Sequence, residues 1–369
     1  MKKVKILLVA VMVLPLVFWS CQNKKDVMKI GFVFPLTGNS ANHGNDFMQG
    51  AYMAYEDFKQ TIDTTSIQIK FLVEDNFSTS KSSVSAFEKL IQIHKPWIVL
   101  GPVASSDMLA MVPIAEKNAT ILFSPAASSP HLSNAGKYIF RMALLAPDQT
   151  SVISKYAYND LNVKEAAVLY TNDETGISYM NSFVDDYTAL GGSIIYNESF
   201  EKENTDFMPQ LLKLRASKSK VVYLSGSPKL LGIILKQAKE INLDVKFLGG
   251  YGAEGNDLID IAQNAAEGFV YTSMPMDVGF IEKYKSVHQK NPNMGVAVGY
   301  DAISITLKLL LENSQDKEQF RNALSQLEYN GVTGWTKILP SGDASKELIL
   351  KTIKNGKFEL YHLGTNDND

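Results

Sequence analysis

The chain has 369 residues and a formal net charge of -3, from 36 Lys and Arg against 39 Asp and Glu. Its hydrophobic content of 45% and charged content of 20% are ordinary for a globular protein and argue against a disordered chain. The length exceeds what one hydrophobic core usually serves, so we expect two domains. The small net charge argues against a nucleic-acid partner.

The first residues have the pattern of an export signal. Three lysines within the first five residues precede an apolar run over 6–18, which suits a signal-peptide core and is too short to span a bilayer. Ser20 and Cys21 follow, and Cys21 is the only cysteine in the chain. A small residue before a cysteine at this place resembles the bacterial lipobox, although Phe18 and Trp19 are bulkier than is usual there.

We therefore predict a signal peptide over 1–20, lipid attachment at Cys21, and a body anchored to a membrane in the cell envelope or periplasm. An ordinary cleaved signal with an incidental cysteine is the alternative.

From residue 28 onward, short apolar runs alternate with stretches of helical period. The first series predicts strands over 29–34, 67–73, 97–100 and 120–123, separated by helices over 43–59, 80–93 and 105–117. The order restarts after residue 147, with helices over 149–160, 178–190, 207–215, 230–241 and 256–264 and strands over 166–170, 193–196, 221–224 and 245–248. A helix over 297–311 and strands over 336–339 and 348–353 finish the chain.

This repeated strand–helix order predicts an α/β fold in which parallel sheets are covered by helices on both faces. Ligands of such doubly wound sheets bind at the carboxyl ends of the strands. The six turns at that edge are rich in small, hydroxylic and glycine residues: 35–38, 101–106, 124–129, 171–176, 225–228 and 249–255.

Hydroxyl groups and helix-start N–H groups donate hydrogen bonds to anions, so these turns predict a donor-rich cleft between two lobes. The alternative is that the same residue types merely fill tight turns and N-caps.

Several segments of the sequence resemble those of a known family. The segments 29–38 (KIGFVFPLTG), 101–106 (GPVASS) and 124–129 (SPAASS) are similar to those of periplasmic leucine/isoleucine/valine-binding proteins, the type 1 ligand-binding receptors of ABC importers. Further landmarks follow in the expected order, at 140–141 (FR), 299–302 (GYDA) and 331–334 (GVTG). The resemblance covers about residues 28–355.

The resemblance implies two Rossmann-like lobes joined by three crossovers, which close on a ligand like a flytrap. The expected first lobe comprises 27–145 plus 275–332, and the second comprises 146–274 plus 333–365. It also implies that Ser105, Ala126 and Ser128 hold a ligand carboxylate through hydroxyl and backbone N–H groups. Ser106 is a further candidate in the same turn.

On the second lobe, the resemblance implies that Thr175, Ser227 and Tyr251 complete the site when the lobes close. Tyr251 stands where amino-acid binders commonly place an acid for the ligand's ammonium group, and Thr175 and Ser227 stand where they commonly place aromatic residues. His43 takes the place of an aromatic cap on the first lobe. The carboxylate half of the site is thus retained and the ammonium half is not, unless Glu254 replaces the acid; a solvent-facing Glu254 is the alternative.

We therefore expect a solute-binding lipoprotein that captures an amino acid, an amino-acid-like molecule or another carboxylate and passes it to an ABC permease. We expect a monomer that acts on no substrate and uses no cofactor. The alternative is a regulatory or scaffolding lipoprotein of the same fold that contacts a protein partner. Small residues at 105, 128 and 226 favour an open ligand cleft over a filled one.

Three observations argue against enzymatic readings. Residues 250–255 fit G-x-G-x-x-G with Asp277 further on, but this is the last turn of its series, and no predicted strand ends at Asp277. The five histidines lack metal-ligand spacing. No G-x-S-x-G elbow is present to expose a nucleophilic serine. The sequence therefore supports binding rather than catalysis.

Overall fold

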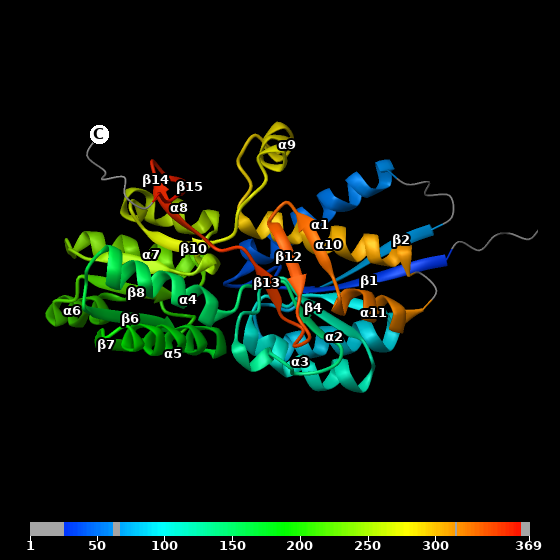
Figure 1. The fold of residues 1–369 in the computed structure, drawn as a ribbon, viewed down its shortest axis with the longest axis horizontal. Helices are drawn as coiled ribbons and strands as arrows, with labels where there is room; N and C mark the ends of the chain where they lie inside the picture. Colours follow the sequence, from blue (N-terminus) through cyan, green and yellow to red (C-terminus); the bar gives the residue numbers. More distant parts are fainter. Residues whose placement is uncertain (1–25, 62–66, 314–315, 363–369) are drawn as a thin grey trace, which may run out of the picture.

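Two parallel sheets organise the molecule, a computed structural model that describes residues 26–61, 67–313 and 316–362. They lie in lobes side by side (Figure 1). The predicted signal peptide and Cys21 lie outside the described residues.

The first sheet has the order β2-β1-β3-β4-β5, with every pair parallel. Its strands are β1 (Asp26–Phe34), β2 (Ile67–Asp75), β3 (Ile98–Leu100), β4 (Ile121–Ser124) and β5 (Ile139–Arg141). Its helices are α1 (Ala41–Thr61), α2 (Ser80–His94), α3 (Ser105–Lys117), α9 (Val278–His288), α10 (Met294–Glu312) and α11 (Lys317–Ser325), with the short η1 (Pro130–Leu132).

The second sheet repeats this order as β7-β6-β8-β9-β10 and adds β14 and β15 antiparallel at its edge. Its strands are β6 (Glu165–Thr171), β7 (Ser193–Phe200), β8 (Val221–Ser225), β9 (Lys246–Gly249), β10 (Val270–Ser273), β14 (Ile349–Lys354) and β15 (Lys357–Leu360). Its helices are α4 (Ala146–Lys155), α5 (Glu174–Ala189), α6 (Met208–Ser217), α7 (Pro228–Glu240) and α8 (Asn256–Ala262), with the short η2 (Tyr156–Asp160), η3 (Tyr251–Ala253) and η4 (Gln263–Ala266).

Each sheet is buried on both faces, as continuous apolar strands require. In β1, Phe32 packs into the core beneath α1 and α10, whereas Val33 packs into the core beneath α2 and α3. In β6, Ala167 and Val168 divide in the same way between two cores of the second lobe. The predicted class, two doubly wound Rossmann-like lobes, is therefore confirmed.

Close helix packing explains one of the sequence landmarks. A Cβ atom at Gly50 of α1 would lie 1.9 Å from the carbonyl oxygen of Val296, and one at Gly299 of α10 would lie 2.2 Å from that of Phe47. Only glycine therefore permits α1 and α10 to approach this closely. By length and composition α10 is also apolar enough to cross a membrane, but 78% of its apolar window is buried inside the protein, as in a core helix.

The last crossing between the lobes comes later than the predicted boundary at 332/333. Strands β11 (Glu328–Gly331), β12 (Gly334–Ile338) and β13 (Ala344–Lys346) form a separate antiparallel sheet. Ile338 and Ala344 pack into the first-lobe core, and only β14 joins the second sheet. The chain therefore crosses between β13 and β14, because burial of this small sheet against the first lobe keeps it there.

Two helices, α9 and α11, were not predicted from the sequence pattern. Each begins at an aspartate N-cap: Asp277 accepts from the N–H of Phe280, and Asp316 accepts from those of Glu318 and Gln319. Capping of this kind fixes the start of short helices whose apolar face is narrow.

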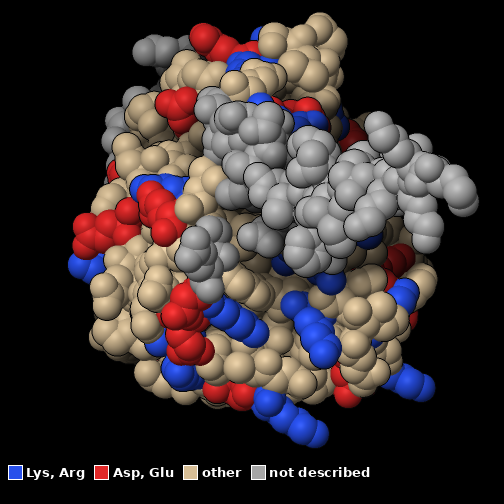
Figure 2. Space-filling view, turned by 90° about the vertical axis from the view of Figure 1, so that its right-hand side faces the viewer, with Lys and Arg blue, Asp and Glu red and all other residues tan. Residues whose placement is uncertain are grey.

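On the end of the first lobe shown in Figure 2, basic and acidic side chains are interspersed over the visible part.

Candidate functional site

A cavity of about 280 Å³ lies between the two lobes. All six turns singled out in the sequence contribute to its wall, through 38; 103 and 104; 126 and 128; 171, 173 and 175; 225–227; and 250–253. In both sheets it lies at the carboxyl ends of the strands, where ligands of doubly wound folds bind. Its size is near the lower end of small-molecule sites, which run from about 300 to 1,000 Å³.

Direct contacts hold the lobes closed around this cavity. The Tyr251 hydroxyl donates to the carbonyl oxygen of Ala126 at 3.2 Å, and burial raises the pKa of Tyr251 well above its usual value, which keeps the hydroxyl protonated. Ser129 Oγ donates to Glu174 Oε1 at 2.6 Å. At the rim, Asn42 donates to Asp257 at 2.5 Å.

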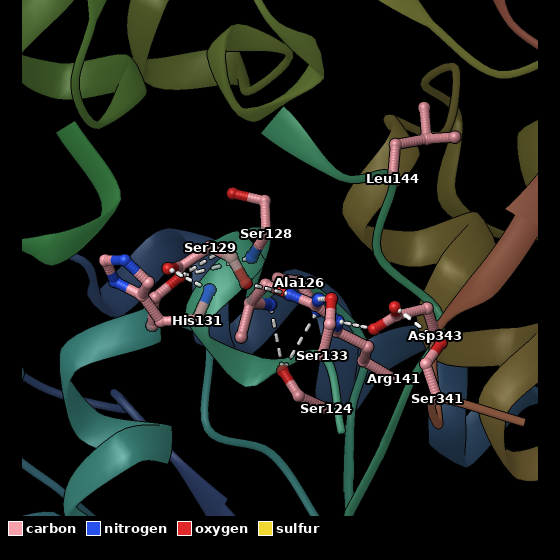
Figure 3. A network of polar contacts seen from close by, with 12 residues as sticks. Ser124, Ala126, Ser128, Ser129, His131, Ser133, Arg141, Leu144, Ser341 and Asp343 are labelled. Carbon is pink, nitrogen blue, oxygen red and sulfur yellow. Dashed lines mark hydrogen bonds and ion pairs between the residues drawn. The ribbon is translucent and has the colours of Figure 1, made fainter. Parts of the chain in front are cut away.

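The turn after β4 is shaped by two serine hydroxyls. Ser124 Oγ accepts from the N–H groups of Ala126 and Ala127 at 3.2 and 2.9 Å. Ser105 Oγ accepts from those of Ser128 and Ser129, both at 3.1 Å. The Ser128 hydroxyl, in contrast, points away from this network toward the second lobe (Figure 3). The backbone of the turn is therefore fixed from within, and the Ser128 side chain lies in the cavity wall, where it hydrogen-bonds to Tyr179 of the second lobe.

A buried ion pair between Arg141 and Asp343 supports the same turn. Arg141 Nε lies 2.7 Å from Asp343 Oδ1, and its guanidinium also donates to the carbonyl oxygens of Ala127 and Ser129 and to Ser133 Oγ (Figure 3). Burial lowers the pKa of Arg141 from its ordinary value, opposed by the charge of Asp343. Arg141 thus ties the binding turn to the segment between β12 and β13.

Two helices direct uncapped N-termini at the cavity, one from each lobe. The N-cap residues Ala104 of α3 and Ser227 of α7 both line the wall. Neither makes a side-chain hydrogen bond to its own helix, although the first N–H group of α3, at Ser105, donates to Thr175 Oγ1 of the second lobe at 3.1 Å. The first-turn N–H groups of an α-helix lack intrahelical partners and carry partial positive charge. This arrangement favours an anionic or hydrogen-bond-accepting ligand.

Formal charges in the wall are few, with Lys202 against Asp173 and Glu203. Asp173 accepts from the N–H of Gly176 and forms an ion pair with Lys202 at 2.9 Å, and Glu203 is exposed at the mouth. Burial lowers the pKa of His43 to about 4, so the imidazole is neutral near pH 7. Within the described residues, no group of three or more His, Cys, Asp and Glu side chains is placed to hold a metal ion.

Six of the nine candidate ligand contacts line the cavity: His43, Ala126, Ser128, Thr175, Ser227 and Tyr251. Ser105 and Ser106 do not; Ser105 instead holds the backbone of the turn. Glu254 also lies outside the cavity wall. Its carboxylate pairs with Lys351 at 2.7 Å and accepts from Tyr271 and Ser273, so it does not replace the missing acid at 251.

The sequence reasoning missed several cavity residues. Phe77, Ser78 and Thr79 follow β2 and form a seventh turn of the same composition, which its Asn-Phe-Ser-Thr sequence could have revealed. Tyr179 and Tyr223 also line the wall. They lie inside a helix and a strand, where an aromatic residue reads as ordinary core.

Gln149 connects the site to the crossings between lobes. It is fully buried at the start of α4, and its amide nitrogen donates to the carbonyl oxygen of Leu144 at 3.1 Å and to the Tyr179 hydroxyl at 2.5 Å. Its amide oxygen accepts from the N–H of Tyr251 at 2.9 Å and from the Thr272 hydroxyl at 3.1 Å. One side chain therefore joins the segment between β5 and α4, and strand β10, to the loop that carries Tyr251.

Comparison with known proteins agrees with this architecture. Residues 27–357 match the family model described as periplasmic binding protein. The leucine-, isoleucine-, valine-, threonine-, and alanine-binding protein of Pseudomonas aeruginosa is 25% identical over 352 residues, covering 93% of this chain and 92% of that protein.

Two solved structures have a similar fold. The leucine-binding protein LivK of Thermotoga maritima superposes with a TM-score of 0.85 at 26% identity, covering 91% of this chain and 98% of that one. A solute-binding protein of an ABC transporter from Rhodopseudomonas palustris, in complex with 3,4-dihydroxybenzoic acid, gives a TM-score of 0.84 at 20% identity, covering 91% and 96%. The family model spans most of the chain, and so this protein belongs to the periplasmic binding protein family.

Proposed function

We propose that the protein captures a small organic carboxylate in the cavity between its lobes and delivers it to an ABC importer. Lipid on Cys21 would keep it at the membrane where that importer lies. The ligand class includes amino acids, amino-acid-like molecules and other carboxylates. The family membership supports a binding role, and the relatives carry names or ligands from the first and last of these groups.

One observation carries the carboxylate assignment. The uncapped N-termini of α3 and α7 come from opposite lobes and meet at one cavity, whose wall also carries the Ser128 hydroxyl. Donors of this kind favour a carboxylate, because charge-assisted hydrogen bonds are about twice as strong as neutral ones. An isolated ammonium group would find no unpaired acid in the wall except the exposed Glu203.

Closure follows from where the contacts originate. The ligand meets Ala126 and Ser128 on the first lobe, and Thr175, Ser227 and Tyr251 approach from the second lobe only when the lobes close. A ligand that binds the closed state more tightly than the open state shifts the population toward closure. The closed form is then the form that an importer would recognise.

A thermal-shift screen of protein refolded free of ligand tests the proposal. The panel holds amino acids, keto acids, aromatic acids, amides and small peptides. A ligand present at 100 times its dissociation constant adds about 2.7 kcal/mol to the free energy of unfolding, which raises the melting temperature measurably. A selective rise with a carboxylate supports the proposal. A flat response across the whole panel would overturn it and direct the search to protein partners.

A further inference from the structure

Two hydroxyl groups in the second-lobe wall of the cavity have no hydrogen-bond partner. Among the described residues, four buried side-chain polar atoms are unpartnered, and two of them are Tyr223 Oη and Ser227 Oγ. Both residues line the cavity. Tyr223 is fully buried, at 0% exposure. Leaving a buried hydroxyl unpaired is costly, so the presence of two such hydroxyls in one wall points to a ligand group that pairs with them.

Local packing holds the Tyr223 hydroxyl in place. Its ring stacks on Phe183 with centroids 4.6 Å apart and an interplanar angle of 11°, and the ring of Tyr179 lies 6.2 Å away. Burial raises the pKa of Tyr223 well above its usual value, so the hydroxyl stays protonated and able to donate. These ring contacts restrict the movement of Tyr223 and of its hydroxyl.

Ser227 adds a second donor at the same wall. It occupies the N-cap position of α7, a helix of 13 residues, yet its hydroxyl does not accept from the helix N–H groups. The first helical residue, Pro228, has no N–H group, so the donors at this end are the Ser227 hydroxyl and the N–H groups of Lys229 and Leu230. The helix N-terminus carries partial positive charge, which favours an oxygen acceptor and disfavours a cation.

These donors are separate from the groups of the first lobe. The Ser128 hydroxyl and the α3 N-terminus serve one end of the ligand, and Tyr223, Ser227 and the α7 N-terminus face it from the other lobe. The wall also includes apolar side chains, among them Val103, Leu224 and Leu230. The cavity therefore combines donors from both lobes with apolar surface.

We propose that Tyr223 and Ser227 form a second acceptor-binding subsite, so that the ligand is a carboxylate whose far end carries an oxygen acceptor (a second carboxylate, a carboxamide or a ketone) and no ammonium group. This inference rests on the proposed function, because it assigns the chemistry of the same cavity. Under this inference the second lobe recognises the far end of the ligand.

Matched probes differing only at that end test the subsite. One series is hexanoate, adipate, adipamate and 6-aminohexanoate, and the other is benzoate, terephthalate, 4-carbamoylbenzoate and 4-(aminomethyl)benzoate. Isothermal titration of ligand-free protein should show, in at least one series, that the carboxylate- or carboxamide-ended probe binds about tenfold or more tightly than the unsubstituted acid. The ammonium-ended probe should bind most weakly.

Variants assign this preference to the two residues. Tyr223→Phe and Ser227→Ala should each remove most of the preference, measured as the ratio of the affinities for the carboxylate- or carboxamide-ended probe and the unsubstituted acid. Tyr223→Phe should also raise the melting temperature of the ligand-free protein, because it deletes an unpaired buried hydroxyl. The matched control is Tyr187→Phe in the same core, which should lower the melting temperature because Tyr187 donates to the carbonyl oxygen of Val163 at 2.8 Å.

The outcomes separate this inference from the proposed function. Equal affinities within both series, tightest binding of the ammonium-ended probes, or a preference that survives in both variants would overturn the subsite and leave carboxylate binding intact. Failure of every probe here, together with a flat response in the broader carboxylate screen, would overturn both. A preference lost in Tyr223→Phe and Ser227→Ala and kept in Tyr187→Phe supports the subsite.

Discussion

The hydroxyl of Tyr251 and the carbonyl oxygen of Ala126 lie 3.2 Å apart across the boundary between the lobes. Tyr251 belongs to the second-lobe loop after β9, yet its ring packs within the first-lobe core. The residue that stands where amino-acid binders place an acid therefore serves here as a latch between the lobes. With tyrosine in place of an acid, the loop contacts the first lobe through a neutral hydrogen bond, and not through an ion pair with a ligand ammonium group.

Replacing Tyr251 with Phe should weaken closure. The variant keeps the ring and removes one neutral hydrogen bond, which is worth about 0.5–1.5 kcal/mol. We expect ligand affinity to fall roughly three- to tenfold, measured by isothermal titration with a ligand from the carboxylate screen. Unfolding by urea should change little at the same time. An unchanged affinity would show that the latch contributes nothing to the closed state.

Alanine substitutions at Ser105 and Ser128 should differ in their effects on the free energy of unfolding and on ligand affinity. Ser105→Ala leaves the N–H groups of Ser128 and Ser129 without their acceptor in a buried turn, so we expect a loss of about 1–3 kcal/mol in unfolding free energy together with weaker binding. Ser128→Ala should weaken binding by about 1–3 kcal/mol through a lost charge-assisted bond and leave stability nearly unchanged. Urea unfolding and titration on both variants check this. Equal effects of the two substitutions on stability would contradict the assignment.

The Arg141–Asp343 pair should be a major support of the binding turn. Arg141→Met leaves a buried carboxylate uncompensated, and breaking a buried pair in this way costs about 3–5 kcal/mol. The double variant Arg141→Met/Asp343→Leu removes both charges and should recover part of that loss. Urea unfolding followed by tryptophan fluorescence measures the difference. A single variant as stable as the wild type would show that the pair is dispensable.

His43 should give stability a pH dependence. Its pKa falls from 6.5 in the unfolded chain to about 4 in the folded protein, so the unfolded state binds more protons between these values. Its contribution is therefore fully present above pH 6.5 and is lost as the pH falls toward 4, by on the order of 3 kcal/mol.

The matched variant His43→Phe isolates this effect from the other titrating groups. Asp46 acts in the opposite sense, because burial raises its pKa to about 6. The difference in unfolding free energy between wild type and His43→Phe, measured from pH 7.5 to 4, should turn against the wild type as the pH falls. A constant difference across this range would contradict a buried neutral His43.

The location of the site at the carboxyl ends of the strands was predictable, because the alternation of strands and helices shows which turns lie there and these turns are rich in small and hydroxylic residues. The later crossing at 346–349 was not, because β12 and β13 look like strands of either lobe until their burial partners are known. Tyr223 was missed since an aromatic residue in a buried strand reads as core. The use of Ser105 to hold backbone N–H groups depends on the turn's three-dimensional path, which sequence does not reveal.

The measurement closest to the central claim is the radius of gyration of the ligand-free protein by small-angle X-ray scattering, before and after saturation with a carboxylate from the screen. We expect a larger radius without ligand and a fall on saturation to the value calculated for the closed structure. Tyr251→Phe should need more ligand to reach the same compact state. A carboxylate that binds in the cavity while the radius stays unchanged would contradict capture by lobe closure.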